Sequence, residues 1–185
     1  MIKAWKQVAS KYIHRESWFK LRSDAVIKGN GEPMDPYYVL EYTDWVNVFP
    51  VLENGKVILV RQYRYGLGAF SIEVPGGIMD PHETHPEEAA RRELLEETGL
   101  TCGSIERVAV VAPNPATQNN RLHCFLATGC VKTHEIAHDE NEEMDILEVE
   151  MDEVLRMLRE NEIIQSLHVS SIMYSLQQLG KVKIG

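Results

Sequence analysis

The sequence is poor in cysteine and in positive charge, and it lacks any long apolar run. Its three cysteines, Cys102, Cys124 and Cys130, are odd in number and lack metal-ligand spacing, so we expect free thiols in a reducing compartment. Lysine and arginine number 19 against 28 aspartates and glutamates, and the net charge of −9 argues against a nucleic-acid surface. No stretch has the pattern of a signal peptide or the length of a membrane span. We therefore expect a cytoplasmic protein with no nucleic-acid or membrane partner.

The most informative segment carries three carboxylates within five positions. Glu93, Glu96 and Glu97 precede Gly99, and in a helix they would project from one face. Like charges at this spacing cost helix stability, and a hard divalent cation with oxygen ligands would remove that cost. The alternative is a solvated acidic face on a surface helix.

The flanking residues predict where this helix begins and ends. Thr84 and Glu87 have the spacing of a capping box, Pro86 suits a first turn, and Gly99 suits a left-handed end. These signals predict a helix over 86–98. Before it, residues 70–74 alternate apolar and polar side chains as a strand does, and a glycine pair at 76–77 then allows a close turn that offers main-chain groups to a ligand.

This arrangement resembles the signature of the Nudix hydrolases, G-x5-E-x7-R-E-U-x-E-E-x-G-U, in which U is aliphatic. Gly77 and Glu83 match its first part, and residues 92–100 match its second part completely. Eight residues, rather than seven, separate Glu83 from Arg92. The extra residue falls where the loop meets the helix, so the helical carboxylates keep their register while Glu83 is displaced by one position.

The resemblance implies hydrolysis of a nucleoside diphosphate linked to another group. It also implies two or more Mg²⁺ ions, for which Mn²⁺ could substitute. Glu93 and Glu97 lie one helical turn apart and are the first-choice metal ligands, with Glu96 next. The resemblance adds the main-chain carbonyl of Gly76 as a ligand. Arg92 is expected to orient a carboxylate of the motif.

A second acidic cluster occupies residues 139–143. It could be a solvated loop. In Nudix proteins similar to ADP-ribose pyrophosphatases, however, a glutamate-rich loop at this place supplies the general base and a metal ligand. By that resemblance we assign Glu140 as the base and Glu142 as a metal ligand, with the reverse assignment open. In other Nudix branches the base is the residue that corresponds to Glu93.

Further residues are candidates for substrate binding. The string Arg61-Gln62-Tyr63-Arg64 resembles an element of ADP-ribose and sugar-nucleotide pyrophosphatases, and Arg64 is the better of its two arginines for gripping a diphosphate. Pro115 lies about where ADP-ribose hydrolases have a proline, although Asn114 and Ala116 flank it where many show a proline-glycine pair. The other candidates are Glu73 before the glycine pair, and two tryptophans that could stack on a base or belong to the core, Trp45 and Trp18.

The chain as a whole predicts an α/β protein in two parts. Residues 1–44 form a small β segment, with strands at 26–27 and 37–42, and residues 45–185 form the Nudix domain. Within that domain, further strands are expected at 46–51, 56–62, 104–112, 122–127 and 146–149, and further helices at 151–158 and 166–179. The resemblance implies an α/β/α sandwich with a mixed sheet. It also implies a homodimer in which the N-terminal segments are exchanged and build part of the neighbour's base pocket.

Three functions remain open. The first is Mg²⁺-dependent hydrolysis of ADP-ribose or a related nucleoside diphosphate sugar, which gives AMP or another nucleoside monophosphate and a sugar phosphate. The second keeps the same site for a nucleoside triphosphate or a dinucleotide. The third is a catalytically silent Nudix domain that binds a ligand, for which loss of motif glutamates would be the mark, and none is lost.

Overall fold

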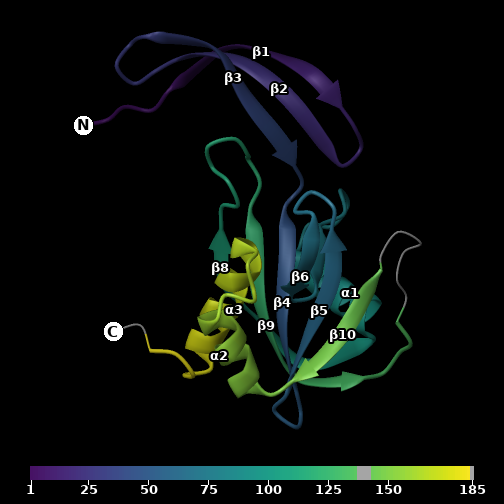
Figure 1. The fold of residues 1–185 in the computed structure, drawn as a ribbon. Coiled ribbons are helices and arrows are strands. Elements are labelled where there is room, and N and C mark those ends of the chain that lie inside the picture. The colour runs from purple at the N-terminus through teal and green to yellow at the C-terminus, as the bar shows by residue number, and fades with distance from the viewer. Residues whose placement is uncertain (137–142, 184–185) are drawn as a thin grey trace. The chain divides into compact units, whose positions relative to one another are not determined.

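The computed structural model describes residues 1–136 and 143–183, and these fall into two compact units (Figure 1). The first unit comprises Met1–Asp44 together with Ala112–Arg121. The second comprises Trp45–Val111 and the described residues from Leu122 onward.

The first unit is an antiparallel sheet in the order β1-β2-β3, formed by Lys6–Arg15, Phe19–Ile27 and Pro33–Tyr42. The segment Ala112–Arg121 lies along β3, where the Leu40 N–H donates to the Thr117 carbonyl at 2.7 Å. The predicted strands at 26–27 and 37–42 are present but longer. Strand β1 was not predicted, because every one of its residues is exposed and it has no buried face to produce an alternating pattern.

The second unit is built on a mixed sheet in the order β10-β5-β4-β9-β8. Strands β4 and β9 are parallel, and the remaining pairs, including β6 on β5 and β7 on β4, are antiparallel. The predicted mixed sheet is therefore confirmed. Its strands are β4 (Trp45–Leu52), β5 (Val57–Arg64), β6 (Ala69–Glu73), β7 (Gly76–Ile78), β8 (Leu100–Val111), β9 (Leu122–Lys132) and β10 (Met144–Val149).

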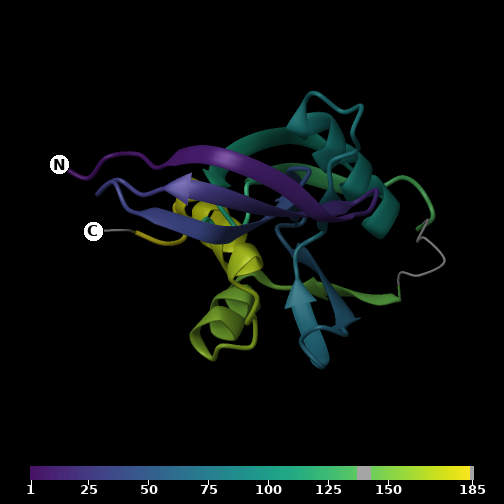
Figure 2. The same cartoon turned by 90° about the horizontal axis from the view of Figure 1, so that it is seen from above.

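Helices cover both faces of this sheet, as Figures 1 and 2 show. Strand β4 illustrates why, since Val46 and Val48 belong to one core cluster with Leu94 of α1 (Pro86–Thr98). Phe49 belongs to a second cluster with Ile172 of α3 (Ser166–Gln178) and with residues of α2 (Met151–Arg159). Neighbouring positions of a strand face opposite sides, so one apolar strand supplies both cores. The predicted α/β/α sandwich is confirmed.

Helix α1 has the predicted bounds but not the predicted cap. Gly99 ends it with φ 70°, in the left-handed region, and Pro86 lies in its first turn. The capping-box prediction for Thr84 and Glu87 was wrong, because the N-cap residue is His85, whose side chain makes no capping hydrogen bond. A proline restricts the residue before it to extended backbone, and His85 adopts φ −117° and ψ 111°, so the helix begins one residue later than the box requires.

Two expectations from composition can be compared with the described residues. All three cysteines lie in the described part of the chain and carry free thiols, as predicted. Of the described helices, none is long and apolar enough to cross a membrane.

Candidate active site

One guanidinium binds three carboxylates at the centre of the site. Arg92 donates through Nε and Nη2 to the two oxygens of Glu83, at 3.0 and 3.1 Å. Its Nη1 donates to Glu93 Oε1 at 2.9 Å and to Glu96 Oε2 at 3.0 Å. The hydrogen bonds from Arg92 hold the pKa of the Glu83 carboxyl below its ordinary value, and the same contacts raise the pKa of Arg92. Arg92 thus offsets much of the repulsion that the acidic helix face would otherwise suffer.

The glycine pair can lie against this cluster because glycine has no side chain, and a Cβ at either position would clash with neighbouring atoms. The Gly76 N–H donates to Glu97 Oε2 at 3.0 Å. A Cβ on Gly77 would lie 2.3 Å from Glu93 Oε1, and a Cβ on Gly76 would lie 2.2 Å from the Val46 carbonyl oxygen. Both glycines belong to strand β7, which pairs with β4. The sequence predicted a tight turn here, whereas the glycines serve close approach between a strand, a second strand and a helix.

The donor atoms around the loop suit a hard divalent cation. Arg92 pairs with three carboxylates, from Glu83, Glu93 and Glu96, and Glu97 adds a fourth from the same helix as Glu93 and Glu96, so the cluster keeps an excess of negative charge. All the side-chain donors are oxygens, as Mg²⁺ prefers. The Glu97 residue is buried, and the side chains of Glu93 and Glu96 are 12% and 46% exposed. Within residues 1–136 and 143–183, no three His, Cys, Asp or Glu side chains are already arranged to hold an ion. Glu140 and Glu142 lie outside the described residues.

The candidate substrate residues Arg64 and Glu73 bind each other. Arg64 donates from Nε to Glu73 Oε1 at 2.9 Å and from Nη2 to Oε2 at 2.5 Å. The Glu73 side chain is fully buried and the Arg64 side chain is 44% exposed. Burial alone would raise the pKa of Glu73, but hydrogen bonds from Arg64 and His168 outweigh it and hold the pKa well below its usual range. The buried Glu73 carboxylate therefore fixes the orientation of the partly exposed Arg64 guanidinium.

Two buried polar residues of this network were missed by sequence reasoning. His168 Nε2 lies 3.0 Å from Glu73 Oε2, and His168 Nδ1 lies 3.3 Å from Nδ2 of Asn47. Asn47 interrupts the apolar run 46–51, and a polar residue in a buried strand is a signal of a buried partner. Nothing comparable in the sequence around His168 distinguishes it from an ordinary helical residue.

The remaining candidates lie at separate places. Arg61, on β5, donates to Asp145 Oδ2 of β10 at 2.6 Å. Trp45 is half-buried at the start of β4. Trp18 and Pro115 are exposed and belong to the first unit.

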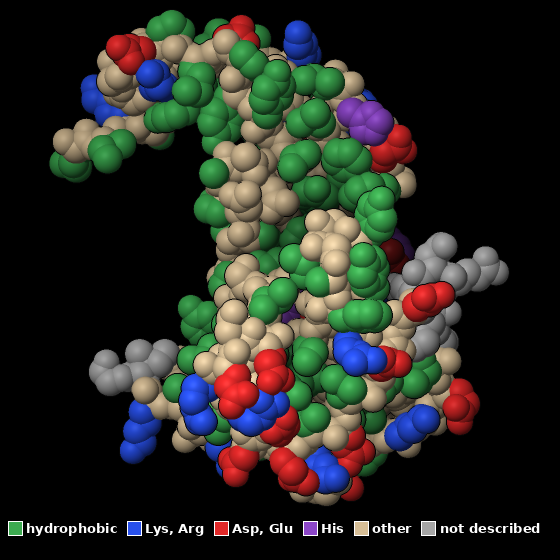
Figure 3. Space-filling model, in the orientation of Figure 1, with side chains coloured by type: hydrophobic (Ala, Val, Ile, Leu, Met, Phe, Trp, Pro, Cys, Tyr) green, Lys and Arg blue, Asp and Glu red, His purple; other side chains and the backbone are tan. Residues whose placement is uncertain are grey.

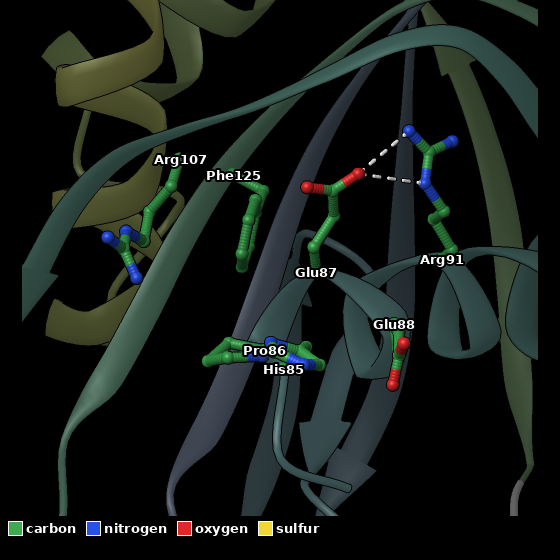
Figure 4. A pocket seen from close by; sticks show the side chains of 7 residues that line it. All are labelled: His85, Pro86, Glu87, Glu88, Arg91, Arg107 and Phe125. Carbon is green, nitrogen blue, oxygen red and sulfur yellow. Dashed lines mark hydrogen bonds and ion pairs between the residues drawn. The ribbon is translucent and has the colours of Figure 1, made fainter.

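A pocket of about 500 Å³ opens beside the first turn of α1 (Figure 4). The Phe125 ring lies between Arg107 and Glu87, and Glu87 accepts from Arg91 at 3.0 Å. The pocket contains none of the four carboxylates that surround Arg92 or contact Gly76, so it is separate from the acidic cluster. Its lining residues are His85, Pro86, Glu87, Glu88, Arg91, Arg107 and Phe125.

Comparisons with known proteins agree with this geometry. Residues 42–167 match the NUDIX domain, and residues 5–40 match the nucleoside diphosphate sugar hydrolase N-terminal domain. The chain is 31% identical to a methanol dehydrogenase activator of Bacillus methanolicus, over 96% of both chains. It is 29% identical to an ADP-ribose pyrophosphatase of Bacillus subtilis strain 168, over 74% of each, and 27% identical to one of Mycobacterium tuberculosis, over 91% of this chain and 82% of that protein.

The fold is shared with a solved structure of an ADP compounds hydrolase. The TM-score is 0.83 at 20% identity, over 98% of this chain and 99% of that one. The NUDIX match covers more than half of the chain and includes the glycine pair, Arg92 and the helical glutamates. The chain therefore belongs to the Nudix family of pyrophosphate-bond hydrolases.

Proposed function

We propose that the protein hydrolyses the diphosphate bond of ADP-ribose or a related nucleoside diphosphate sugar. The products would be AMP, or another nucleoside monophosphate, and a sugar phosphate. The N-terminal match to nucleoside diphosphate sugar hydrolases and the two ADP-ribose pyrophosphatases among the relatives support this substrate class.

The observation that carries the proposal is the packing of Gly77 against Glu93. The absence of a side chain at Gly77 brings main chain to the carboxylates of α1, where Glu97 already holds the Gly76 N–H. Carboxylate and main-chain oxygens from these two segments would form the donor set that suits Mg²⁺ or Mn²⁺. Glu93, Glu96, Glu97 and the Gly76 carbonyl would hold the ions, and Glu142 would add another ligand.

The roles of the protein groups follow from their charges. Bound Mg²⁺ would lower the pKa of an attacking water and stabilise charge on the diphosphate oxygens. Arg92 keeps Glu93 and Glu96 in place. The Arg64 side chain is held by Glu73 and is 44% exposed, and its guanidinium would bind the diphosphate of the substrate. Glu140 would take the proton from water, and Glu142 or Glu93 are the alternatives for that role.

We also propose that the first unit serves a homodimer. Figure 3 shows hydrophobic side chains at the surface of the first unit. Four apolar residues of this unit, Trp5, Val8, Ile13 and Trp18, are 49–61% exposed. An exposed apolar surface of this kind is typical of an association site. Exchange of this unit between two copies would bury these side chains and bring a residue such as Trp18 to a neighbour's nucleobase. Sedimentation velocity of the full chain, compared with a Val8→Glu variant, tests the dimer.

Substitution of single glutamates tests the proposed reaction. With ADP-ribose and Mg²⁺, Glu97→Gln should nearly abolish AMP release, and unchanged activity would sink the metal-site assignment. Glu140→Gln should lower kcat far more than it raises KM if this residue is the base. Chelation of the metal should remove activity and readdition should restore it.

A second candidate is hydrolysis of a dinucleotide at the same site. The methanol dehydrogenase activator, which aligns over 96% of this chain, is not named for a nucleotide sugar. Its similarity therefore does not favour a sugar over a second nucleotide as the group beyond the diphosphate. A substrate panel that includes ADP-ribose, GDP-mannose, NAD and a nucleoside triphosphate separates the candidates. Preference for NAD would favour the second candidate, and preference for the triphosphate would overturn both.

A further inference from the structure

A histidine outside the Nudix signature reaches the glycine loop from the opposite side. His168 lies on α3, with its side chain 5% exposed. Its Nδ1 lies 3.2 Å from the main-chain nitrogen of Val74 and 3.3 Å from Nδ2 of Asn47, and its Nε2 lies 3.0 Å from Glu73 Oε2. A main-chain N–H can only donate, so Nδ1 is the acceptor and the ring proton sits on Nε2, which donates to Glu73. Both ring nitrogens are therefore committed.

Two peptide groups that precede the Gly76 carbonyl, those of Glu73–Val74 and Pro75–Gly76, are held by three different elements. The Val74 N–H donates to His168 of α3, and the Pro75 carbonyl accepts from the Val48 N–H of β4 at 2.8 Å. The Gly76 N–H donates to Glu97 of α1 at 3.0 Å. With its peptide neighbours fixed in this way, the direction of the Gly76 carbonyl is set by partners on both sides of the sheet.

The same histidine also reaches the candidate phosphate-binding arginine. Glu73 accepts from His168 and, through both its oxygens, from Arg64. Because the Glu73 side chain is fully buried, its orientation depends on these partners, and the plane of the Arg64 guanidinium depends in turn on Glu73.

We infer that His168 is a positioning residue that serves both ends of the site, through Nδ1 toward the Gly76 carbonyl and through Nε2 toward Arg64. The inference rests on the proposed function, in which Gly76 binds the metal and Arg64 binds the diphosphate. It assigns to α3 a role that the signature residues do not reveal. Hydrogen-bonded groups behind a ligand commonly tune metal affinity by about 10- to 100-fold.

Two substitutions separate the two ring nitrogens. In His168→Asn the side-chain oxygen can replace Nδ1 as acceptor for Val74, but the side chain is too short to donate to Glu73. In His168→Gln the amide can reach Glu73 as a donor, but the acceptor near Val74 is lost. Ser175→Ala is the matched control on the same helix, because the Ser175 hydroxyl is buried and has no hydrogen-bond partner among the described residues.

The readouts are Mn²⁺ binding by electron paramagnetic resonance, hydrogen exchange of the Val74 amide, and KM for ADP-ribose at saturating Mg²⁺, all on the full chain. We expect His168→Gln to weaken Mn²⁺ binding about tenfold and to speed Val74 exchange, with little change in KM. We expect His168→Asn to raise KM about tenfold, with Mn²⁺ binding near that of the unsubstituted protein. Ser175→Ala should match the unsubstituted protein in all three.

A general loss of stability would weaken both functions in both variants, so thermal unfolding midpoints accompany each measurement. If the two variants change Mn²⁺ binding and KM alike, or change neither, the positioning role is wrong. If the unsubstituted protein hydrolyses no nucleoside diphosphate derivative, the proposed function fails. The Mn²⁺ and exchange measurements then still decide whether His168 fixes the position of the backbone at residues 74–76.

Discussion

Arg92 holds Glu83 with two parallel hydrogen bonds, from Nε to Oε1 at 3.0 Å and from Nη2 to Oε2 at 3.1 Å. This pair bridges the loop before α1 and the middle of the helix. The loop closes on itself to make the contact, since the Asp80 N–H donates to Glu83 Oε2 at 2.7 Å and the Glu83 N–H donates to the Asp80 carbonyl. Glu83 thus anchors the guanidinium whose remaining edge supports Glu93 and Glu96.

Because Arg92 binds Glu83 in bidentate fashion, we expect the site to depend on the planar shape of the guanidinium as well as on its charge. Arg92→Lys keeps one positive charge but cannot bind Glu83 in two-pronged fashion while it also reaches Glu93 and Glu96. We expect kcat/KM for ADP-ribose to fall about 10- to 100-fold. Steady-state kinetics at several Mg²⁺ concentrations measure this fall. Arg91→Lys is the control, because Arg91 pairs with Glu87 on the solvent side, and equal losses in the two variants would contradict the role of Arg92.

Local signals allowed α1 and strand β6 to be predicted, because they depend on residues close in sequence. Gly99 at the left-handed end, Pro86 in the first turn and the alternation before Gly76 each reflect the backbone of a few residues. The bounds 86–98 follow from them. The cap failed since proline also restricts the residue before it, and that constraint prevails over the capping-box spacing.

The network behind the loop could not be predicted in the same way. Asn47, Glu73 and His168 lie on β4, β6 and α3, and only the packing of α3 on the sheet brings them together. Similarly, an inserted residue in the sequence left Glu83 out of register, although the loop restores its contact with Arg92. Strand β1 was missed because it buries no face that would impose a pattern.

The buried Glu73 carboxylate should make stability depend on pH in the acid range. Its pKa in the folded protein lies below the ordinary value of 4.5, so the unfolded chain binds more protons as the pH falls through that range. The stability that Glu73 contributes is complete above about pH 5 and is lost progressively below it. In Glu73→Gln the free energy of unfolding should therefore decrease less steeply with acid, from a lower value at pH 7. Urea denaturation at pH 3, 4, 5 and 7 measures both effects.

Glu153→Gln provides the comparison for that experiment. Glu153 is also bound by an arginine, Arg156, at 2.6 Å, but it lies at the surface of α2, where solvent screens the pair. The free energy of unfolding of Glu153→Gln should therefore decrease with acid as steeply as that of the unsubstituted protein. An identical acid slope for Glu73→Gln and the unsubstituted protein would show that Glu73 does not carry the effect.

The three thiols should differ in reactivity. Burial raises the pKa of Cys130 to about 12, and burial also raises the pKa of Cys124 and of the half-buried Cys102. The thiolate is the reactive form, so at pH 8 we expect Cys102 to react slowly with an aromatic disulfide reagent and the other two to react only on unfolding. Absorbance titration with and without guanidinium chloride counts the thiols. Rapid reaction of two or more thiols in the folded protein would contradict this ranking.

The two glycines of the loop should respond differently to the same substitution. A Cβ on Gly77 meets the Glu93 carboxylate at 2.3 Å, and a side-chain end can move aside, so Gly77→Ala should fold normally while Glu93 leaves its position. A Cβ on Gly76 meets the Val46 carbonyl at 2.2 Å, and the backbone of a central strand cannot move aside without loss of packing.

We expect Gly77→Ala to weaken Mn²⁺ binding about tenfold or more with little change in melting temperature. Gly76→Ala should instead lower the free energy of unfolding by about 1–3 kcal/mol. Calorimetric melting and Mn²⁺ titration of both variants test the contrast. Normal Mn²⁺ binding by Gly77→Ala would show that metal binding does not require Glu93 at its present position beside Gly77.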